Sequence, residues 1–217
     1  MRMHSTITSP YARKVWVVAH ETGLIDRIER IATNPHADEY LRSDNPLCRV
    51  PTLIRDGGET LFDSPVICEY LDSLHQGPKL FPSDGPARWR ALRLQAVGDG
   101  LLDANLSRRN EILRPASEQS RDWIARQMMA LTAGCRWLEQ HVDELDQASI
   151  DIGQIAVGCA LGYFALRFPD DRWRDNCPKL SSWQERFEQR PSMIATHHET
   201  LKRTLPPELI KEGPSRH

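Results

Sequence analysis

Short apolar segments alternate with helix-like stretches over the first 75 residues of the chain. Apolar runs bounded by turn residues predict strands, and the turn Asp56-Gly57-Gly58 predicts a β-hairpin. The expected strands lie in three segments, residues 2–6, 26–33 and 50–63. The expected helices cover residues 10–20, 35–46 and 64–74. The pattern therefore predicts the order β-α-β-α-β-β-α, which is typical of a small α/β domain.

The pattern changes after this part of the chain. Residues 75–88 contain two glycines and three prolines without periodicity, and we interpret them as a linker. The stretches beyond it are all helical in character: residues 87–110, 117–146, 151–168 and 180–190. We therefore expect an α/β domain over residues 1–77 and an all-helical domain over residues 87–205. Five tryptophans fall on apolar faces and are expected in the core: Trp89, Trp123, Trp137, Trp173 and Trp183.

Composition and charge exclude several classes of function. The 217 residues include 28 Lys and Arg against 30 Asp and Glu, so no overall positive charge favours nucleic acid. No apolar run approaches the roughly 18 residues of a membrane span. The first ten residues also lack the apolar core of a secretory signal. We expect a cytoplasmic protein with no nucleic-acid partner and no membrane partner.

Cysteine and histidine spacing gives no sign of a metal or disulfide site. The five cysteines are scattered and never form a Cys-x-x-Cys pair, which argues against a disulfide scaffold, a zinc site or a dithiol centre. The neighbours His197 and His198 have no third ligand at metal-binding spacing. The sequence therefore predicts no bound metal.

The first candidate for chemistry is Ser9, which precedes Pro10 at the start of the first expected helix. Serine is a favoured helix cap and proline a favoured first helical residue, so capping alone explains the pair. A thiolate held near Ser9 would nevertheless meet a hydroxyl donor and the positive end of the helix, which lower the pKa of a thiol. The segment fits both a plain helix start and a thiolate site.

The second candidate is Val50-Pro51, directly before a predicted strand. Proline cannot donate to a strand ladder, so its place here is unusual. A cis Val50-Pro51 bond in a turn would leave the N–H and C=O of Val50 pointing outward. The alternative is a trans proline at the first residue of the strand.

The third candidate is Asp63-Ser64, which opens the helix expected over residues 64–74. Free N–H groups and the positive dipole end at a helix start attract a carboxylate. A ligand with both an amine and a carboxylate would place its carboxylate on Ser64 and its ammonium on Asp63. The alternative is that Ser64 only caps the helix.

The order and spacing of these segments resemble the cytosolic glutathione S-transferase family over nearly the whole chain. In the first part, "TSPYARKV", "NPLCRVPTL" and "LFDSPVICEYL" resemble the family's Ser/Cys-Pro-Phe, Asn-Pro-x-Gly-Lys-Val-Pro-x-Leu and Glu/Asp-Ser-x-x-Ile-x-x-Tyr-Leu segments. In the helical part, "SIDIGQIAVGCALGYF" is similar to the family's buried helix, with Asp151 and Gln154 able to cap it reciprocally. The segment "CPKLSSWQERFEQRPSMIAT" is similar to the family's Pro-x-Leu-x-x-Trp…Arg-Pro-Ser ending. Within the family the chain looks most like the bacterial YibF-type transferases.

The resemblance implies a fold and a role for each candidate residue. The fold would be an α/β thioredoxin-like domain followed by an all-α C-terminal helical bundle. Ser9 would hydrogen-bond the sulfur of glutathione. Val50, beside a cis Pro51, would pair its backbone with the cysteinyl unit. Asp63 and Ser64 would hold the γ-glutamyl end.

The chain departs from the family pattern near two of these positions. Cys48 stands where the family has Gly, so a different loop conformation is expected there, and this puts in doubt whether Arg49 reaches the glycyl carboxylate. Thr8 and Tyr11 also carry hydroxyls, and the catalytic hydroxyl is one of these two or that of Ser9. A serine cannot form a mixed disulfide with glutathione, so conjugation or plain binding is expected rather than disulfide or peroxide reduction.

The function implied by the resemblance is that of a glutathione S-transferase. It would use glutathione as co-substrate and join its thiolate to a small electrophile, as a homodimer with a role in detoxification. The electrophile would be held by Tyr11 and by helical residues around Leu102 to Arg109. The alternative is a non-catalytic glutathione-transferase-like protein that serves as a binding or interaction module associated with stress or transcription.

Overall fold

The structure of the chain is a computed structural model in which residues 1–211 are described. The contacts between residues divide it into two units. The N-terminal unit contains Met1–Phe81 and the chain from Arg190 to the last described residue, and the helical unit contains Pro82–Gln189. No helix within residues 1–211 combines the length and the apolar composition that crossing a bilayer requires.

The N-terminal unit is built on a four-stranded mixed sheet. Its strands, in chain order, are β1 (Arg2–Ser5), β2 (Glu29–Ala32), β3 (Thr52–Ile54) and β4 (Thr60–Leu61). They lie in the order β2-β1-β3-β4, with β1 parallel to β2 and the other two pairs antiparallel. This is the sheet of the predicted thioredoxin-like domain, and the Asp56-Gly57-Gly58 turn joins β3 to β4 as expected.

Two amphipathic helices supply most of the core of this unit. Helices α1 (Pro10–Glu21) and α3 (Ser64–Ser73) pack side by side, and α3 also contacts β3. Their apolar faces are fully buried, and so are the sheet residues Met3 and Leu53. Helix α1 ends before Gly23, whose φ of 68° is the left-handed conformation that favours glycine. The helix limits expected from the apolar spacing are thus confirmed to within a residue or two.

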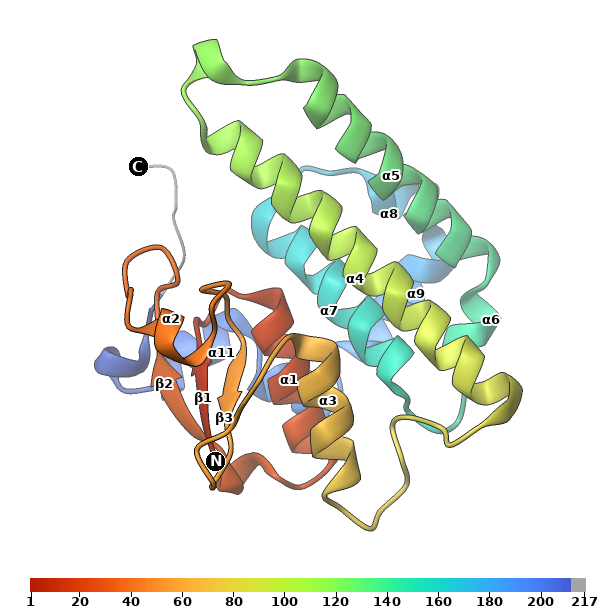
Figure 1. Cartoon of the computed structure of the whole chain (residues 1–217). Coiled ribbons are helices and arrows are strands. Elements are labelled where there is room, and N and C mark those ends of the chain that lie inside the picture. The colour runs from red at the N-terminus through yellow and green to blue at the C-terminus, as the bar shows by residue number, and fades with distance from the viewer. Residues whose placement is uncertain (212–217) are drawn as a thin grey trace. The chain divides into compact units, whose positions relative to one another are not determined.

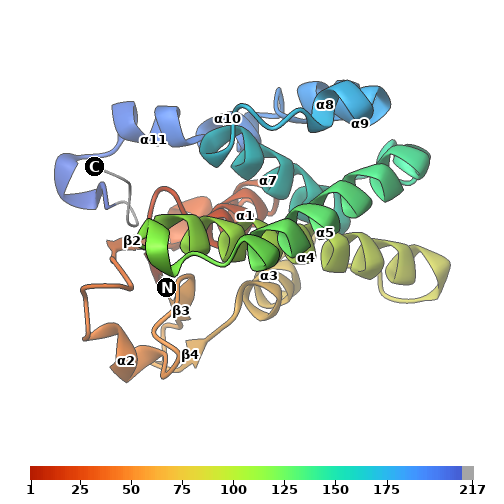
Figure 2. The ribbon, with the colours of Figure 1, turned by 90° about the horizontal axis from the view of Figure 1, so that it is seen from above.

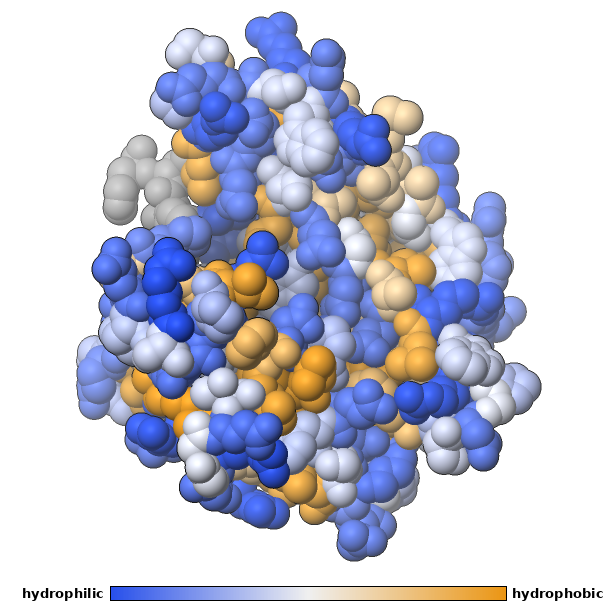
Figure 3. Space-filling model, viewed as in Figure 1, coloured by the Kyte–Doolittle hydropathy of each residue, from blue (hydrophilic) through white to orange (hydrophobic). Residues whose placement is uncertain are grey.

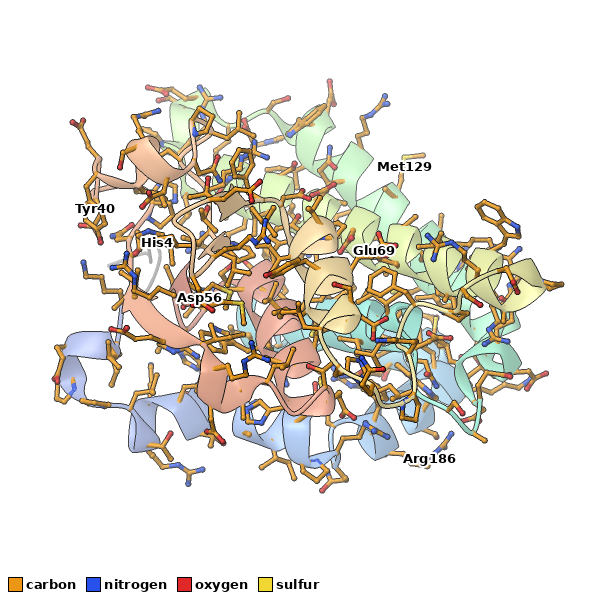
Figure 4. The ribbon with its side chains drawn as sticks, turned by 60° about the horizontal axis from the view of Figure 1, so that its bottom comes forward. His4, Tyr40, Asp56, Glu69, Met129 and Arg186 are labelled. Atoms are coloured by element: carbon orange, nitrogen blue, oxygen red, sulfur yellow. The ribbon has the colours of Figure 1, made fainter. Side chains whose placement is uncertain are left out.

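The segment between β2 and β3 differs from its expectation. A polar helix was expected over residues 35–46, but only the short α2 (Leu41–Asp44) forms. Side-chain bonds to β1 hold it in place: the ring of His4 bonds Asp44 Oδ2 at 2.9 Å and Thr33 Oγ1 at 2.8 Å. His4 also lies beside Tyr40, with ring centroids 5.9 Å apart (Figure 4). Buried tertiary bonds therefore fix this segment, because it is too short for a stable helix on its own.

The helical unit contains six of the helices within the described residues. They are α4 (Gly85–Leu113), α5 (Arg121–Gln140), α6 (Val142–Leu145), α7 (Ile152–Arg167), α8 (Trp173–Asn176) and α9 (Pro178–Phe187). The apolar α7 is buried along most of its length and packs mainly against α4, which in turn packs against α5 (Figure 1). The expected helical runs correspond to α4, to α5 with α6, to α7 and to α9.

The tryptophans do not all lie in the core. Trp183 is buried and stacks on Phe187, as expected. In contrast, 69% of Trp89 and 45% of Trp123 are exposed, so their predicted burial is wrong. Both stand near the start of a helix, where the neighbouring turn covers only part of a large ring. Apolar residues also reach the surface elsewhere in small patches among hydrophilic ones (orange in Figure 3).

The end of the described chain returns to the N-terminal unit. Helices α10 (Pro191–Ala195) and α11 (His198–Thr204) follow one another along one side of that unit, and α10 contacts α1 (Figure 2). The N–H of Ile7 then donates to the carbonyl oxygen of Lys211 at 3.0 Å. Residues 190–205, expected with the helical domain, thus make their contacts with the N-terminal unit. The division into two domains over residues 1–77 and 87–205 stays a prediction.

Candidate functional site

Ser9 lies at the N-cap of α1, as the sequence predicts. Its Oγ accepts a hydrogen bond from the backbone N–H of Ala12 at 3.2 Å. A serine hydroxyl has one donor and two acceptor lone pairs, so capping leaves its O–H free to donate to a ligand. Ser9 is half-buried and therefore reachable. Thr8 before it is buried and Tyr11 is half-buried, and both stay candidates for the same role.

The peptide bond between Val50 and Pro51 is cis, which is the first of the two alternatives that the sequence left open. Val50 is half-buried. Its N–H and C=O form no hydrogen bond with any of residues 1–211. An extended peptide can pair with such a free backbone edge in the way that a strand adds to a sheet.

A buried amide holds the loop before this bond. Nδ2 of Asn45 donates to the carbonyl oxygen of Arg49 at 3.2 Å and to Oγ1 of Thr52 at 2.9 Å. Oδ1 of Asn45 accepts from the N–H of Leu47 at 2.9 Å. Sequence reasoning treated Asn45 only as the end of a helix and missed this role. The available signal was Asn-Pro before a strand, since an Asn side chain often bonds the backbone two residues on.

Cys48 adopts a left-handed conformation with φ of 51°. Glycine is the residue that favours this region, so the loop turns here as it would with glycine. Whether the loop differs from that of the relatives stays a prediction. Arg49 follows with an exposed side chain, and its carbonyl oxygen is fixed by Asn45 and by Oγ1 of Thr52 at 2.8 Å.

The cap of α3 differs by one residue from the cap that the sequence offers at Ser64. Asp63, not Ser64, is the N-cap, and its carboxylate forms no capping hydrogen bond. Ser64 is instead the first helical residue and is 1% exposed, and its role as a ligand-binding residue stays a prediction. The exposed carboxylate of Asp63 thus stands beside the first N–H groups of a helix that no side chain caps. A second cis bond joins Phe62 to Asp63.

Sheet register brings the three segments to one end of the N-terminal unit. β1 runs antiparallel to β3, with His4 opposite Thr52, so the chain leading to Ser9 leaves the sheet where Pro51 enters it. β4 runs antiparallel to β3, with Leu61 opposite Leu53. The start of α3 therefore follows β4 at the same end. The three candidate segments are neighbours although 55 residues separate the first from the last.

A half-buried cation, Arg30, lies at the same end of the sheet. Nη1 of Arg30 donates to Oγ of Ser5, the last residue of β1, at 2.9 Å, and its guanidinium stacks over the ring of Trp16 at 4.2 Å. Burial lowers the pKa of Arg30 to about 10, so it keeps its charge at neutral pH. The pattern of apolar and polar residues in the short β2 strand did not indicate this position of Arg30.

Metal-binding side chains are not clustered in the described part of the chain. No group of three or more His, Cys, Asp or Glu side chains there is placed to hold a metal ion. His197 accepts a hydrogen bond from the N–H of Glu199 at the start of α11, which is a capping role.

Comparisons with known proteins agree with this arrangement. The glutathione S-transferase N-terminal domain model matches residues 8–74, and the C-terminal domain model matches residues 121–186. The chain is 32% identical over 199 residues to the GST-like protein YibF of Escherichia coli, itself described as uncharacterized, and the match covers 90% of this chain and 98% of YibF.

A solved structure from Pseudomonas fluorescens Pf-5, a glutathione transferase family member with bound glutathione, is 41% identical, with a TM-score of 0.86 over 90% of this chain and 98% of that one. A second structure from that organism holds S-(propanoic acid)-glutathione, at 40% identity and a TM-score of 0.84 over 91% and 98%. The resemblance seen in the sequence is therefore confirmed, and so is the predicted fold.

Proposed function

Because the chain belongs to the glutathione S-transferase family, we propose that it binds glutathione and transfers its thiolate to a small electrophile. The observation that carries this proposal is the free backbone of Val50 beside the cis Pro51, at the sheet end that also holds Ser9 and Ser64. The glutathione bound in the similar structure from Pseudomonas fluorescens supports it.

Glutathione would lie in extended form along this end of the N-terminal unit. Its cysteinyl N–H and C=O would pair with the backbone of Val50. Its γ-glutamyl carboxylate would accept from Ser64 at the start of α3, where helix N–H groups favour an anion, and its ammonium would pair with Asp63. The exposed Arg49 would reach the glycyl carboxylate.

The chemistry would depend on the thiolate. The O–H of Ser9 and the positive end of α1 would stabilise it, and the thiol proton would pass to solvent. A thiol pKa lowered from ~8.5 toward 7 raises the thiolate fraction at neutral pH by roughly tenfold. The sulfur then forms a C–S bond with an electrophilic carbon, either as a leaving group departs with the electrons of its bond or by addition to an activated double bond whose other carbon takes a proton from solvent. We place this reaction in a cytoplasmic homodimer with a role in detoxification.

The test combines calorimetry with glutathione and a turnover assay with chlorodinitrobenzene. We expect binding, turnover, and a thiolate absorbance band of bound glutathione that titrates near pH 7. In Ser9→Ala the titration should shift toward ~8.5 and turnover should fall about tenfold at neutral pH. Ser120→Ala is the matched control. Ser120 caps α5 in the same way, with its Oγ accepting from the N–H of Trp123 at 3.2 Å, and it is not a residue of the candidate site.

Two further results would redirect the assignment. An unchanged titration in Ser9→Ala would move the catalytic role to Thr8 or Tyr11, which Thr8→Val and Tyr11→Phe then separate. Binding without turnover of any electrophile tested would favour the non-catalytic binding protein. Absence of any binding heat with glutathione would contradict both assignments.

A further inference from the structure

One face of the sheet in the N-terminal unit carries a row of buried polar side chains. His4 of β1 and Thr52 of β3 lie directly opposite each other, so their side chains share this face. Thr33, directly after β2, reaches His4 from the third neighbouring strand. Thr33 and Thr52 are completely buried, and His4 is nearly so. Buried polar groups are rarely left unpaired, so the partners of this row show which segment it holds in place.

The row binds the end of α2 and the residue after it. Nδ1 of His4 bonds Oγ1 of Thr33 at 2.8 Å, and its Nε2 donates to Oδ2 of Asp44 at 2.9 Å, because a carboxylate only accepts. The next residue, Asn45, is buried, and its Nδ2 donates to Oγ1 of Thr52 at 2.9 Å. Two consecutive residues are therefore bound to opposing residues of neighbouring strands. We name Thr33, His4, Asp44, Asn45 and Thr52 the His4–Thr52 network.

The network ends on the peptide group between Arg49 and Val50. The carbonyl oxygen of this group, which belongs to Arg49, accepts from Oγ1 of Thr52 at 2.8 Å and from Nδ2 of Asn45 at 3.2 Å. The peptide bond is trans. In a planar trans peptide group the C=O and the N–H point in opposite directions. Two donors that fix the carbonyl oxygen therefore also fix the direction of the N–H of Val50.

The two ends of this peptide group are in different environments. The carbonyl oxygen faces buried donors, whereas the N–H belongs to the half-buried Val50 and has no acceptor among residues 1–211. Hydrogen bonds accepted by a carbonyl also polarise the peptide group, which makes its N–H a stronger donor. The network thus prepares one backbone N–H, in direction and in strength, for an acceptor that the described chain does not supply.

We propose that Thr52 and His4 are positioning residues for glutathione. They act through the Arg49–Val50 peptide group and aim its N–H at the cysteinyl carbonyl of the bound tripeptide. This inference rests on the proposed function and adds to it two residues that touch neither glutathione nor the electrophile. Thr52 acts directly on the carbonyl of Arg49, and His4 acts through Asp44, which fixes the backbone at Asn45.

The network should affect how tightly glutathione is held and not how its thiol ionises. No hydrogen bond within residues 1–211 joins the network to Ser9 or to α1, the two groups that would stabilise the thiolate. Loss of a network bond should therefore raise KM for glutathione and leave kcat at saturating glutathione unchanged. A residue of the thiolate site would instead change kcat and the titration of the bound thiol.

Thr52→Val tests the direct contact, because it replaces the hydroxyl by a methyl group of similar size. We expect Kd and KM for glutathione to rise about tenfold, the order expected when one hydrogen bond to a ligand is lost. The thiolate titration of bound glutathione should not move. Thr52→Ser keeps the hydroxyl, and its Kd should stay within about twofold of the wild-type value. Calorimetry, steady-state kinetics and the thiolate absorbance measure these effects.

Thr22→Val is the matched control. Thr22 is also a buried threonine of the N-terminal unit, and its Oγ1 donates to the carbonyl oxygen of Val18 at 2.8 Å, away from the loop before Pro51. Its variant loses a comparable hydrogen bond, so it corrects for a general loss of stability. We expect its Kd for glutathione to equal that of the wild type.

Asp44→Ala tests the contribution of His4. Asp44 is only half-buried, so this variant should fold even if Thr52→Val does not, and circular dichroism checks both. We expect Kd for glutathione to rise about threefold, since the effect passes through Asn45. Asp44→Asn keeps an oxygen that accepts from Nε2 of His4 and should restore the wild-type Kd. In the double variant with Thr52→Val, Asp44→Ala should add less than it does alone, because both act on one peptide group.

The outcomes separate this proposal from the proposed function. Weaker binding in Thr52→Val and Asp44→Ala, with recovery in Thr52→Ser and Asp44→Asn, supports the positioning roles. Unchanged binding in both, an equal loss in Thr22→Val, or a fall in kcat with a shifted thiolate titration would overturn them and leave the proposed function standing. If Thr52→Val does not fold, the two Asp44 variants decide in the same way. Absence of binding to the wild-type protein would contradict the proposed function, and this proposal with it.

Discussion

At the residue scale, the loop before Pro51 depends on a few side chains in unusual settings. Cys48 has a left-handed φ, which glycine adopts readily. In other residues this conformation is destabilised because Cβ crowds the backbone. Asn45 replaces the missing strand bonds by bonding Arg49 and Thr52 from a fully buried position. The free edge of Val50 is therefore the product of loop side chains rather than of the sheet.

Substitution of Cys48 tests the first of these effects. Cys48→Val places a branched side chain at φ of 51°, and we expect a loss of about 1–2 kcal/mol in the free energy of unfolding, with weaker glutathione binding. Cys48→Gly should keep binding and change stability by less than about 1 kcal/mol, since relief of strain is offset by unfolded-state entropy. Urea unfolding and calorimetry measure both. Equal behaviour of the two variants would contradict the role given to the backbone.

The candidate site could be predicted from the sequence where short-range chemistry determines the result. Ser9 before Pro10 fixes a helix start, and the capping preference alone places its hydroxyl. The choice between cis and trans at Pro51 was not predictable from the residues, because the two forms differ little in energy and tertiary contacts decide. The cap of α3 lies at Asp63 rather than at Ser64, and the sequence did not decide between them, since both are good caps.

At the element scale, α7 begins with a reciprocal capping box. Oδ1 of Asp151 accepts from the N–H of Gln154 at 3.1 Å, and Oε1 of Gln154 accepts from the N–H of Asp151 at 2.7 Å. This confirms the capping expected from the sequence. Asp151 also accepts from Arg90 of α4 at 3.2 Å, which was not predictable because 61 residues separate the two.

Two substitutions of Asp151 separate these contributions. Asp151→Ala removes the cap and the partner of Arg90, and we expect a loss of about 2 kcal/mol in the free energy of unfolding. Asp151→Asn keeps a good cap and loses only the charge, so its loss should be well under half as large. Chemical unfolding followed by circular dichroism measures both. If Asn cost as much as Ala, the pairing with Arg90 and not the cap would stabilise this end of α7.

The close packing of α4 on α7 gives a second prediction at this scale. A Cβ on Gly98 would lie 2.6 Å from the backbone of Ala156, so Gly98→Ala must push the helices apart, and we expect a loss of about 2–3 kcal/mol. Gly100→Ala on the same helix is the control, because its Cβ meets nothing within 4 Å and alanine favours the helix by ~0.8 kcal/mol. Thermal unfolding of both variants should therefore move in opposite directions.

At the scale of the whole molecule, the change from short strands to long amphipathic helices near residue 80 predicted two units, because it follows the period of the hydrophobic pattern. The return of the last helices to the N-terminal unit was not predictable in this way. It depends on bonds between residues far apart, such as those of Glu21 with Arg190 at 2.9 Å and with Ser192. No local sequence pattern indicates partners that are so far apart in the chain.

These bonds make the attachment of α10 to α1 dependent on pH. Burial would raise the pKa of Glu21, but hydrogen bonds from Arg190 and Ser192 and the Arg190 charge outweigh it, so the pKa lies below its ordinary value of 4.5. A lowered pKa means that the stabilisation is fully present above about pH 4.5 and is lost as the pH falls through the folded-state value.

The variant Glu21→Gln removes this charge, and we expect it to lower the free energy of unfolding by about 1–2 kcal/mol at pH 7, the range for a hydrogen-bonded charge that is partly exposed to solvent. The difference from the wild type should shrink as the pH falls below 4.5 and vanish once Glu21 is protonated in the folded state as well as in the unfolded state. Glu29→Gln is the control, since Glu29 is exposed on β2, and it should show no such trend. Urea unfolding at pH 7, 5 and 3.5 measures both variants, and a difference that stays constant with pH would mean that the shape of the side chain, not its charge, holds α10 in place.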